Sequence, residues 1–287
     1  MRIVIGALFL SVLAGFGLAQ DSTQAPEPTV QVRALTIVAN DLPEADRQRV
    51  EQSLQGRTYG VQELAERVRM SLLDLGYYSA HADFPQLSDI HEGSPFRSAE
   101  VSIRVEPGVQ YHLGGIDFHG ASLFPPDQLR RQFPIETGSL ISATGIGKGL
   151  EGLKNLYLEN GYINVGAIPL TRIDEARRVI NLTIDVDEGK RYVFGSLFLV
   201  GVEPHAGAAK ALLAGWTSLE DKPYNPQLLV KWLATNAPFL NRAADMLDHV
   251  TAHQDQAAGQ IDIQLEFPDV SIESLASRRH GAEAARP

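Results

Sequence analysis

Apolar and polar positions follow two different periods along this chain, and the two periods come in a fixed order. Residues 61–75 carry apolar side chains at the i, i+3, i+4 and i+7 spacing of a helix with one buried face. Residues 101–105 alternate between apolar and polar, which is typical of a strand with one buried face. A strand over 30–40, a shorter helix that ends near Gly56 and an extended segment over 77–87 complete the pattern. The predicted order is strand, helix, helix, strand, strand.

The same order of elements returns twice further along the chain. The second copy places its elements at 111–120, 125–133, 146–160, 163–173 and 180–186. The third copy places them at 192–201, 205–216, 225–236, 248–253 and 261–267. The first strand carries the repeat most clearly, because YHLGGIDFHG at 111–120 recurs about 80 residues later as YVFGSLFLVG, with a weaker copy, QVRALTIVAN, at 31–40.

This period predicts an α+β chain of three tandem βααββ domains. We place the domains at 30–108, 109–189 and 190–268. The residues that recur in register or mark the turns form the predicted structural motif: Gly76, Tyr77, Gly108, Tyr111, Gly114, Gly120, Gly161, Tyr162, Gly189, Tyr192, Gly195 and Gly201. Gly76 and Gly161 each follow a long helix, at the position where a left-handed residue without a Cβ is favoured.

Residues 1–19 have the features of a secretory signal peptide. A basic residue precedes an apolar core, and Gly17 and Ala19 are the small residues that a signal peptidase requires. The apolar run is shorter than the ~20 residues needed to span a bilayer, so we favour cleavage over the alternative of an uncleaved anchor. Residues 20–29 are then a polar linker, and residues 269–287, rich in Ala and Arg, are predicted to be a disordered tail.

Composition and motifs narrow the possible functions. The net charge of −10 would repel nucleic acid and anionic lipid, and the absence of cysteine excludes disulfides and thiolate metal sites. Gly145–Gly149 resembles a phosphate-binding loop, but it lacks the further Gly and the Ser or Thr of that motif, so we predict a flexible turn. We predict no catalytic, cofactor-binding or metal-binding residue and therefore no enzyme. The alternative hypothesis is an enzyme whose active site the sequence motifs do not reveal.

Four aromatic residues fall close together in the third copy: Trp216, Tyr224, Trp232 and Phe239. Packing in a hydrophobic core is the ordinary role of such residues, and we take it as the expectation. The alternative is an exposed patch that binds a partner protein.

The repeated unit resembles the POTRA domain. Two stretches carry the resemblance, because in each a strand runs through an acidic residue and a turn glycine into the Tyr-x-x-Gly strand: VSIRVEPGVQYHLGGIDFHG at 101–120 and INLTIDVDEGKRYVFGSLFLVG at 180–201. A long helix that ends in Gly-Tyr, at 72–77 and 157–162, is the second cue. The resemblance implies a three-stranded mixed sheet covered by two helices in each domain.

The resemblance also implies a periplasmic scaffold. POTRA arrays of the BamA and TamA type, and those of two-partner secretion transporters, handle unfolded outer-membrane client chains or recruit accessory lipoproteins. Such proteins continue into a transmembrane β-barrel, whereas here residues 269–287 follow the third domain. We therefore expect a free periplasmic protein, or one docked onto a separate outer-membrane barrel, that is peripheral to the membrane at most and binds no nucleic acid. The alternative is an envelope adaptor, anchored by an uncleaved N-terminal segment, that only holds partner proteins together.

The resemblance finally implies that the second strand of each domain lies at a sheet edge, at 79–87, 166–173 and 248–254. An unpaired edge can accept another strand through main-chain hydrogen bonds, whatever the sequence of that strand. The candidate protein-binding residues are Ser79, His81, Asp83, Gly166, Ile168, Leu170, Arg172, His249 and Thr251. Edges can also be covered by a neighbouring domain or blunted by charge and proline, as by Asp83 with Pro85 or Arg172 with Asp174, so accessible and covered edges remain open alternatives.

Overall fold

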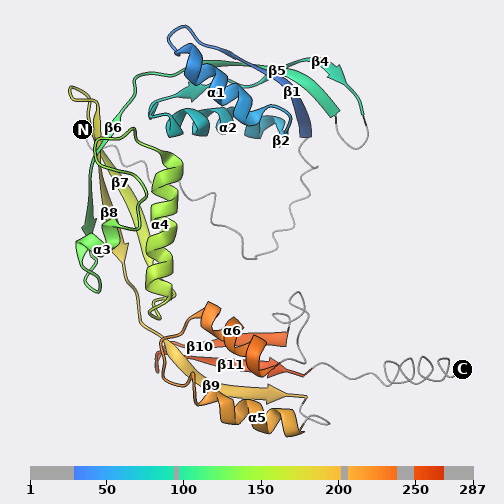
Figure 1. Ribbon diagram of the computed structural model, residues 1–287, viewed down its shortest axis with the longest axis vertical. Helices are drawn as coiled ribbons and strands as arrows, with labels where there is room; N and C mark the ends of the chain where they lie inside the picture. The colour runs from blue at the N-terminus through green and yellow to red at the C-terminus, as the bar shows by residue number, and fades with distance from the viewer. Residues whose placement is uncertain (1–28, 94–96, 202–205, 238–248, 268–287) are drawn as a thin grey trace, which may run out of the picture. The chain divides into compact units, whose positions relative to one another are not determined.

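The computed structural model describes residues 29–93, 97–201, 206–237 and 249–267 (Figure 1). The predicted signal peptide, nearly all of the linker, Phe239 and the predicted tail lie outside the described residues. Within the described ranges, no helix has the length and apolar character that crossing a membrane would require. The described chain forms three β-sheets, and we call each sheet with its helices the first, second or third module.

The first module is built around a five-stranded sheet. Its elements are β1 (Thr29–Val38), α1 (Glu44–Leu54), β2 (Thr58–Gly60), α2 (Val61–Asp74), β3 (His81–Ala82), β4 (Gln86–His91) and β5 (Arg97–Glu106). The strand order is β2-β1-β5-β3, and β4 also pairs with β5. β1 runs parallel to β5, whereas β3 and β4 run antiparallel to it. The short β2 and the division of the edge strand into β3 and β4 were not expected from the sequence.

The second and third modules have three-stranded sheets of the same topology. The second contains β6 (His112–His119), α3 (Pro126–Arg130), α4 (Ala143–Leu158), β7 (Gly166–Asp174) and β8 (Val179–Asp187), in the order β6-β8-β7. The third contains β9 (Val193–Val200), α5 (Ala206–Trp216), α6 (Pro226–Asn236), β10 (Val250–Asp255) and β11 (Gln260–Glu266), in the order β10-β11-β9. In both, the first and last strands are parallel and the last two form an antiparallel hairpin, so the predicted mixed α+β fold is confirmed.

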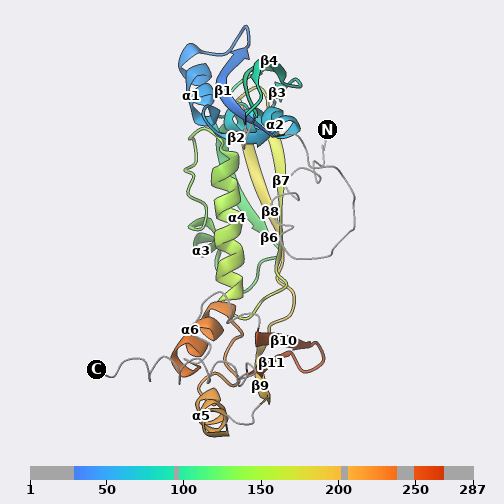
Figure 2. The same ribbon diagram turned by 90° about the vertical axis from the view of Figure 1, so that its right-hand side faces the viewer.

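Each sheet turns one face toward its helices and buries it. In α2 the fully buried residues Leu64, Val68 and Leu72 lie on one face, as the helical spacing predicted. In β8 the buried positions alternate from Ile180 to Val186, as the strand pattern predicted. Helices α1 and α2 lie on one face of the first sheet, and α4 lies along the second (Figure 1, Figure 2).

Contacts divide the chain into two compact units. The first unit contains residues up to Leu153 together with Gly166–Asp187, and therefore the first two sheets. The second unit contains Lys154–Val165 and the residues from Glu188 onward, and therefore the third sheet with the end of α4. The first and second modules thus belong to one compact body.

The predicted structural glycines lie mostly in the left-handed region. Positive φ angles occur at Gly76, Gly108, Gly120, Gly161, Gly189 and Gly201. Gly161 has a φ of +91°, and a Cβ at this position would lie 2.3 Å from the backbone oxygen of Tyr192. Because the backbone N–H of Tyr192 donates to the Gly161 carbonyl oxygen at 2.8 Å, only a glycine lets the two chain segments pass so closely.

The other predicted motif residues are four tyrosines and two glycines. Tyr162 is half-buried, and its ring meets that of Tyr157 edge to face at 5.9 Å. Tyr77, Tyr111 and Tyr192 are buried. Gly114 and Gly195 lie where the register shifts between β6 and β8 and between β9 and β11.

The helix predicted over 146–160 is confirmed as α4, whereas the flexible turn predicted at Gly145–Gly149 is wrong, because these residues form the first part of that helix. A Cβ at Gly149 would lie 2.1 Å from Cδ1 of Phe133, and one at Gly145 would lie 2.4 Å from Cγ2 of Ile135. The glycines therefore let α4 approach residues 133–135 closely. Tertiary packing outweighs the low helix propensity of glycine in this segment.

Candidate functional site

Strand β7 forms a long edge of the second sheet. Each of its residues, from Gly166 to Asp174, has a partner on β8, and no strand of the described chain pairs with its other side. Ile168 and Leu170 lie opposite Asp185 and Thr183, which alternate with the buried residues of β8. Cross-strand partners share a face, so these two side chains lie on the sheet face that points away from the core.

The exposed surface of β7 is apolar. Ile168 is 56% exposed, and Leu170 and Ile173 are 41% and 40% exposed. Arg172 is exposed as well, and the neighbouring Asp174 is 3.9 Å from Arg177 rather than paired with Arg172. Pro169 has no N–H, so it removes one hydrogen-bond donor from this edge. The edge is therefore long and apolar, with one interruption in its backbone donors.

The predicted edge strand of the first module, 79–87, is wrong in its extent. Ser79 lies in a turn, His81 pairs with Glu106 in the short β3, and Asp83 lies in the break before β4. The Asp83 N–H still donates to the backbone oxygen of Arg104 at 2.9 Å. β4 then extends beyond residue 87, to His91.

A charged cluster that the sequence did not predict adjoins β4. Arg33 contacts the Asp89 carboxylate and lies 3.6 Å from Glu100. Asp89 has a positive φ of 45° within a register shift of β4, and Arg33 lies at a register shift of β1. The bulges and charges blunt this edge, so it is a poorer template for another strand than β7. The partners are 56 residues apart in the sequence, which is why no local signal revealed them.

Strand β10 forms the corresponding edge of the third module. It pairs with β11 from Val250 to Asp255 without a register shift, and Thr251 lies opposite Gln264. His249 precedes the strand rather than belonging to it, so β10 begins at Val250, later than the predicted start at 248. The exposed side chains of β10 are mostly polar, so an added strand would gain backbone bonds with little apolar contact.

The aromatic residues of the third module pack in its core, as expected. Trp216, Tyr224 and Trp232 are 4%, 8% and 7% exposed. The indole N–H of Trp216 donates to the Gly195 carbonyl oxygen at 2.8 Å, and the rings of Trp216 and Trp232 meet edge to face at 5.2 Å. These three residues are therefore unavailable as a partner-binding patch.

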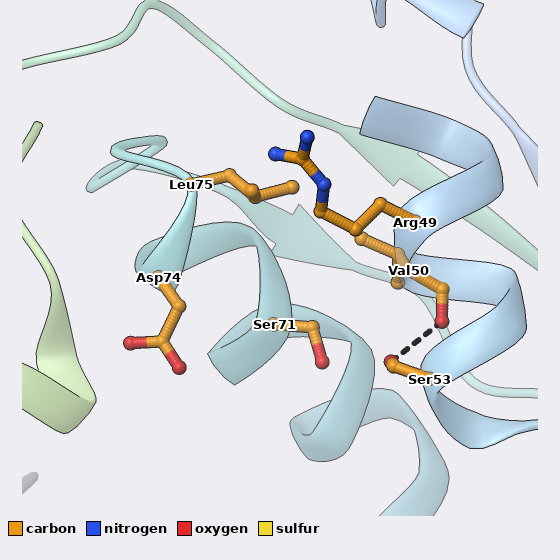
Figure 3. A pocket seen from close by; sticks show the side chains of 6 residues that line it. All are labelled: Arg49, Val50, Ser53, Ser71, Asp74 and Leu75. Carbon is orange, nitrogen blue, oxygen red and sulfur yellow. Dashed lines mark hydrogen bonds between the residues drawn. The ribbon is translucent and has the colours of Figure 1, made fainter. Parts of the chain in front are cut away.

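A shallow hollow of about 200 Å³ lies between α1 and α2 (Figure 3). Ser53 donates to the Val50 carbonyl oxygen and Ser71 to that of Arg67, so both hydroxyls are used within their own helices. The Asp74 carboxylate is engaged with residues of the second module. The hollow is smaller than a typical small-molecule site and holds no converging reactive groups.

The described residues offer no cluster of metal-ligating side chains, and the tyrosines with raised pKa values are hydrogen-bonded or buried. No three His, Asp or Glu side chains of the described residues converge to hold a metal ion. Burial, with a hydrogen bond to Asp46, raises the pKa of Tyr77 to about 12. Burial also raises the pKa of Tyr157, which donates to Glu188, and that of Tyr224. These shifts keep the tyrosines neutral and fit a structural role.

The second module matches a known family of protein domains. Residues 111–189 match the family model for POTRA, described as "Surface antigen variable number repeat". The chain is 25% identical over 149 residues to the outer membrane protein assembly factor BamA of Buchnera aphidicola subsp. Acyrthosiphon pisum, a match over 48% of this chain and 23% of that protein. The chain therefore spans less than a quarter of the length of this curated relative.

A solved structure has the same architecture over most of the chain. The crystal structure of POTRA3-5 of Haemophilus influenzae BamA superposes with a TM-score of 0.56 and 16% sequence identity. The superposition covers 85% of this chain and 99% of that one. The second module thus matches the POTRA family model, and the fold of the chain is similar to that of the BamA POTRA domains.

Proposed function

We propose that this chain is a periplasmic scaffold in outer-membrane protein assembly, and that it binds client chains or partner proteins by strand addition at its sheet edges. The POTRA match of residues 111–189 and the similarity to BamA support the general role. The partners in this proposal are unfolded outer-membrane clients, a separate outer-membrane barrel or an accessory lipoprotein. The proposed mechanism needs surfaces rather than a reactive centre, so we propose no enzymatic activity.

The proposed domain organisation of the chain rests on the repeat in its sequence and on the resemblance to POTRA domains. We propose a signal peptide at 1–19, three POTRA-like domains at 30–108, 109–189 and 190–268, and a periplasmic location for the exported chain. The three separate sheets support the division into domains.

The observation that carries the binding mode is the edge strand β7. An extended chain laid beside it would gain main-chain hydrogen bonds that do not depend on its own sequence. Alternate apolar side chains of that chain would contact Ile168 and Leu170, which are otherwise exposed to water. Such a partner has the alternating pattern of an outer-membrane strand, whose apolar residues occur at every second position. Pro169 reduces the backbone contribution by one donor, so the apolar contacts set much of the affinity.

The binding mode can be tested by NMR with the full chain and a peptide of about ten residues in which apolar and polar residues alternate. We expect amide shifts to change along 166–174 and to stay unchanged along β6, the opposite edge of the same sheet. The double variant Ile168→Lys with Leu170→Lys should weaken binding by at least about tenfold, because two apolar contacts are lost. The matched control is Asp117→Lys, an exposed residue of β6, and it should bind as the wild type does.

The proposal fails if the peptide leaves the β7 amides unchanged, or if the β6 control weakens binding as much as the β7 variant does. A shift confined to β10 would keep strand addition but move it to the third module.

A further inference from the structure

Asp74, the last residue of α2, lies at the N-terminus of α4 in the next module. Its Oδ1 accepts hydrogen bonds from Ser142 Oγ at 2.9 Å and from the Thr144 backbone N–H at 2.8 Å. Its Oδ2 accepts a hydrogen bond from Thr144 Oγ1 at 2.6 Å. Asp74 therefore caps a helix that begins about 70 residues further along the chain, in addition to the cap that Ser142 provides for Gly145.

The position of Asp74 is unfavourable for its own helix. An acidic side chain at a helix C-terminus opposes the helix dipole, and the last turn of α2 contains no basic residue to offset it. The first turn of α4 contains no acidic residue, although that is where a negative charge is favoured. Asp74 thus supplies to α4 the charge that α4 lacks. A residue that breaks a local rule in this way often has a role outside its own element.

Residues next to Asp74 make further contacts with the second module. The Tyr111 backbone N–H donates to the Gly76 carbonyl oxygen at 2.9 Å, and Gln110 Nε2 donates to the Leu75 carbonyl oxygen at 2.9 Å. The hydroxyls of Tyr78 and Thr171 are 3.2 Å apart. We call this set of contacts, made by residues 74–78 with the second module, the first joint. It lies within one compact unit of the chain.

We propose that Asp74 holds the first and second modules in one fixed orientation by capping α4 across the first joint. Backbone contacts at Gly76 tether the two modules but leave rotation about the tether possible. The carboxylate adds three directional bonds away from Gly76, against one from the Tyr78–Thr171 contact, so it supplies most of the restraint on that rotation. The edges formed by β4 and β7 then keep a constant separation, which a scaffold with more than one binding edge requires.

The following module boundary provides a matched comparison. We call the contacts of residues 159–163 with the third module the second joint. Glu159 stands two residues before Gly161, as Asp74 stands two residues before Gly76. Glu159 is exposed, and within the described chain its carboxylate makes no hydrogen bond or ion pair. Helix α6 is instead capped by Asn225 of its own module, whose Oδ1 accepts from the backbone N–H groups of Gln227 and Leu228.

Spin-label distance measurements test the proposal directly. The chain has no cysteine, so Gln52→Cys on α1 and Glu151→Cys on α4, both exposed, place one label on each module of the full chain. We expect a narrow distance distribution in the parent protein. Asp74→Ala should broaden it by at least about twofold, because the modules then rotate about the tether. Asp74→Asn, which keeps one acceptor oxygen, should give an intermediate width, and Glu159→Ala should leave the width unchanged.

Two further measurements make the result decisive. Circular dichroism of each variant reports whether its helices remain folded. If Asp74→Ala does not fold, Thr144→Val decides the question, because it removes only the 2.6 Å bond to Oδ2 and should still broaden the distribution. Unchanged widths in folded Asp74→Ala, or in Thr144→Val where that variant decides, would overturn the proposal. Equal broadening by Glu159→Ala would overturn it as well.

Discussion

The two joints of the array share one backbone contact. In each, the glycine that follows the long helix accepts a hydrogen bond from the tyrosine that begins the next module, Tyr111 to Gly76 at 2.9 Å and Tyr192 to Gly161 at 2.8 Å. Both glycines have a positive φ. The same turn geometry is therefore used twice to pass the chain from one module to the next.

The joints differ in the side chains around that contact. The first joint is polar, with the Asp74 cap and the Tyr78–Thr171 hydrogen bond. Both joints also have a side chain that donates to the backbone, Gln110 to Leu75 at the first and Arg191 to Asn160 at the second. At the second joint Ile163 occupies the position of Tyr78, and it packs against the core of the third module. Hydrogen bonds are directional, so they restrict the angle between two modules. Apolar burial is non-directional, so it holds two modules close together and restricts that angle less. The same backbone turn can therefore either fix the orientation of two modules or only hold them close together, depending on a few side chains around it.

The largest expected effect comes from the contact that both joints share. Gly161→Ala should lower the free energy of unfolding by about 3 kcal/mol, because it combines a left-handed φ with a Cβ that meets a backbone oxygen at 2.3 Å. Gly76→Ala should cost less, about 1–2 kcal/mol, since its Cβ would lie 3.0 Å from the Leu140 side chain, which can move, and 3.2 Å from the Tyr111 backbone oxygen, a looser contact than the one at Gly161. Urea unfolding followed by circular dichroism measures both.

Gly207→Ala is the matched control for these glycine variants. Gly207 lies in α5, and a Cβ there would meet nothing within 4 Å. This variant should be neutral or stabilising by up to about 1 kcal/mol, because alanine is the better helix former. Equal losses at Gly76 and Gly161 would show that close backbone approach does not distinguish the two joints.

Local chemistry made part of this structure predictable. The helix predicted over 225–236 is confirmed as α6, which begins with Asn225 as its N-cap and Pro226 as its first helical residue, a pairing typical of a helix start. The apolar spacing likewise located α2 and β8. These features could be predicted because each depends on residues within one or two turns of the chain.

Features that depend on distant residues could not be predicted. The partners of Asp74 lie 68 and 70 residues away in the sequence. The only local signal of its role at α4 is an acidic residue at the C-terminus of α2, where the helix dipole disfavours a negative charge. The helix over 146–160 was predicted, but the close approach of its glycines to Phe133 was not, and the break in the first edge strand adjoins the Arg33 cluster. In each case tertiary contacts override the local preference.

A buried tyrosine near each joint predicts a loss of stability at alkaline pH. Tyr77 donates to Asp46 and Tyr157 to Glu188, both at 2.8 Å. Burial raises the pKa of Tyr77 to about 12, whereas an unfolded tyrosine titrates near ~10. The folded state then keeps its proton longer than the unfolded state. The stabilising contribution is therefore complete below pH ~10 and is lost as the pH rises toward ~12, by about 2 kcal/mol.

Unfolding of the wild type and of Tyr77→Phe between pH 8 and 12 measures this loss. The advantage of the wild type should shrink by about 2 kcal/mol over that range, since phenylalanine has no proton to lose. Tyr157→Phe should show a change of the same sign, because burial raises the pKa of Tyr157 as well. A constant difference across the range would mean that the Tyr77 pKa is not raised in the folded chain.

The smallest expected effect separates the Tyr78–Thr171 contact of the first joint from the Ile163 packing of the second. Tyr78→Phe and Thr171→Val each remove one partner of a 3.2 Å hydrogen bond, so a double-mutant cycle should give a coupling of about 0.5–1 kcal/mol. Ile163→Ala should destabilise the protein through lost packing, yet show no coupling to Thr171→Val, because Ile163 packs against the third core. Coupling between Ile163 and Thr171 would mean that the two joints act as one connected structure. Absence of coupling between Tyr78 and Thr171 would leave the Asp74 cap as the polar contact that distinguishes the first joint.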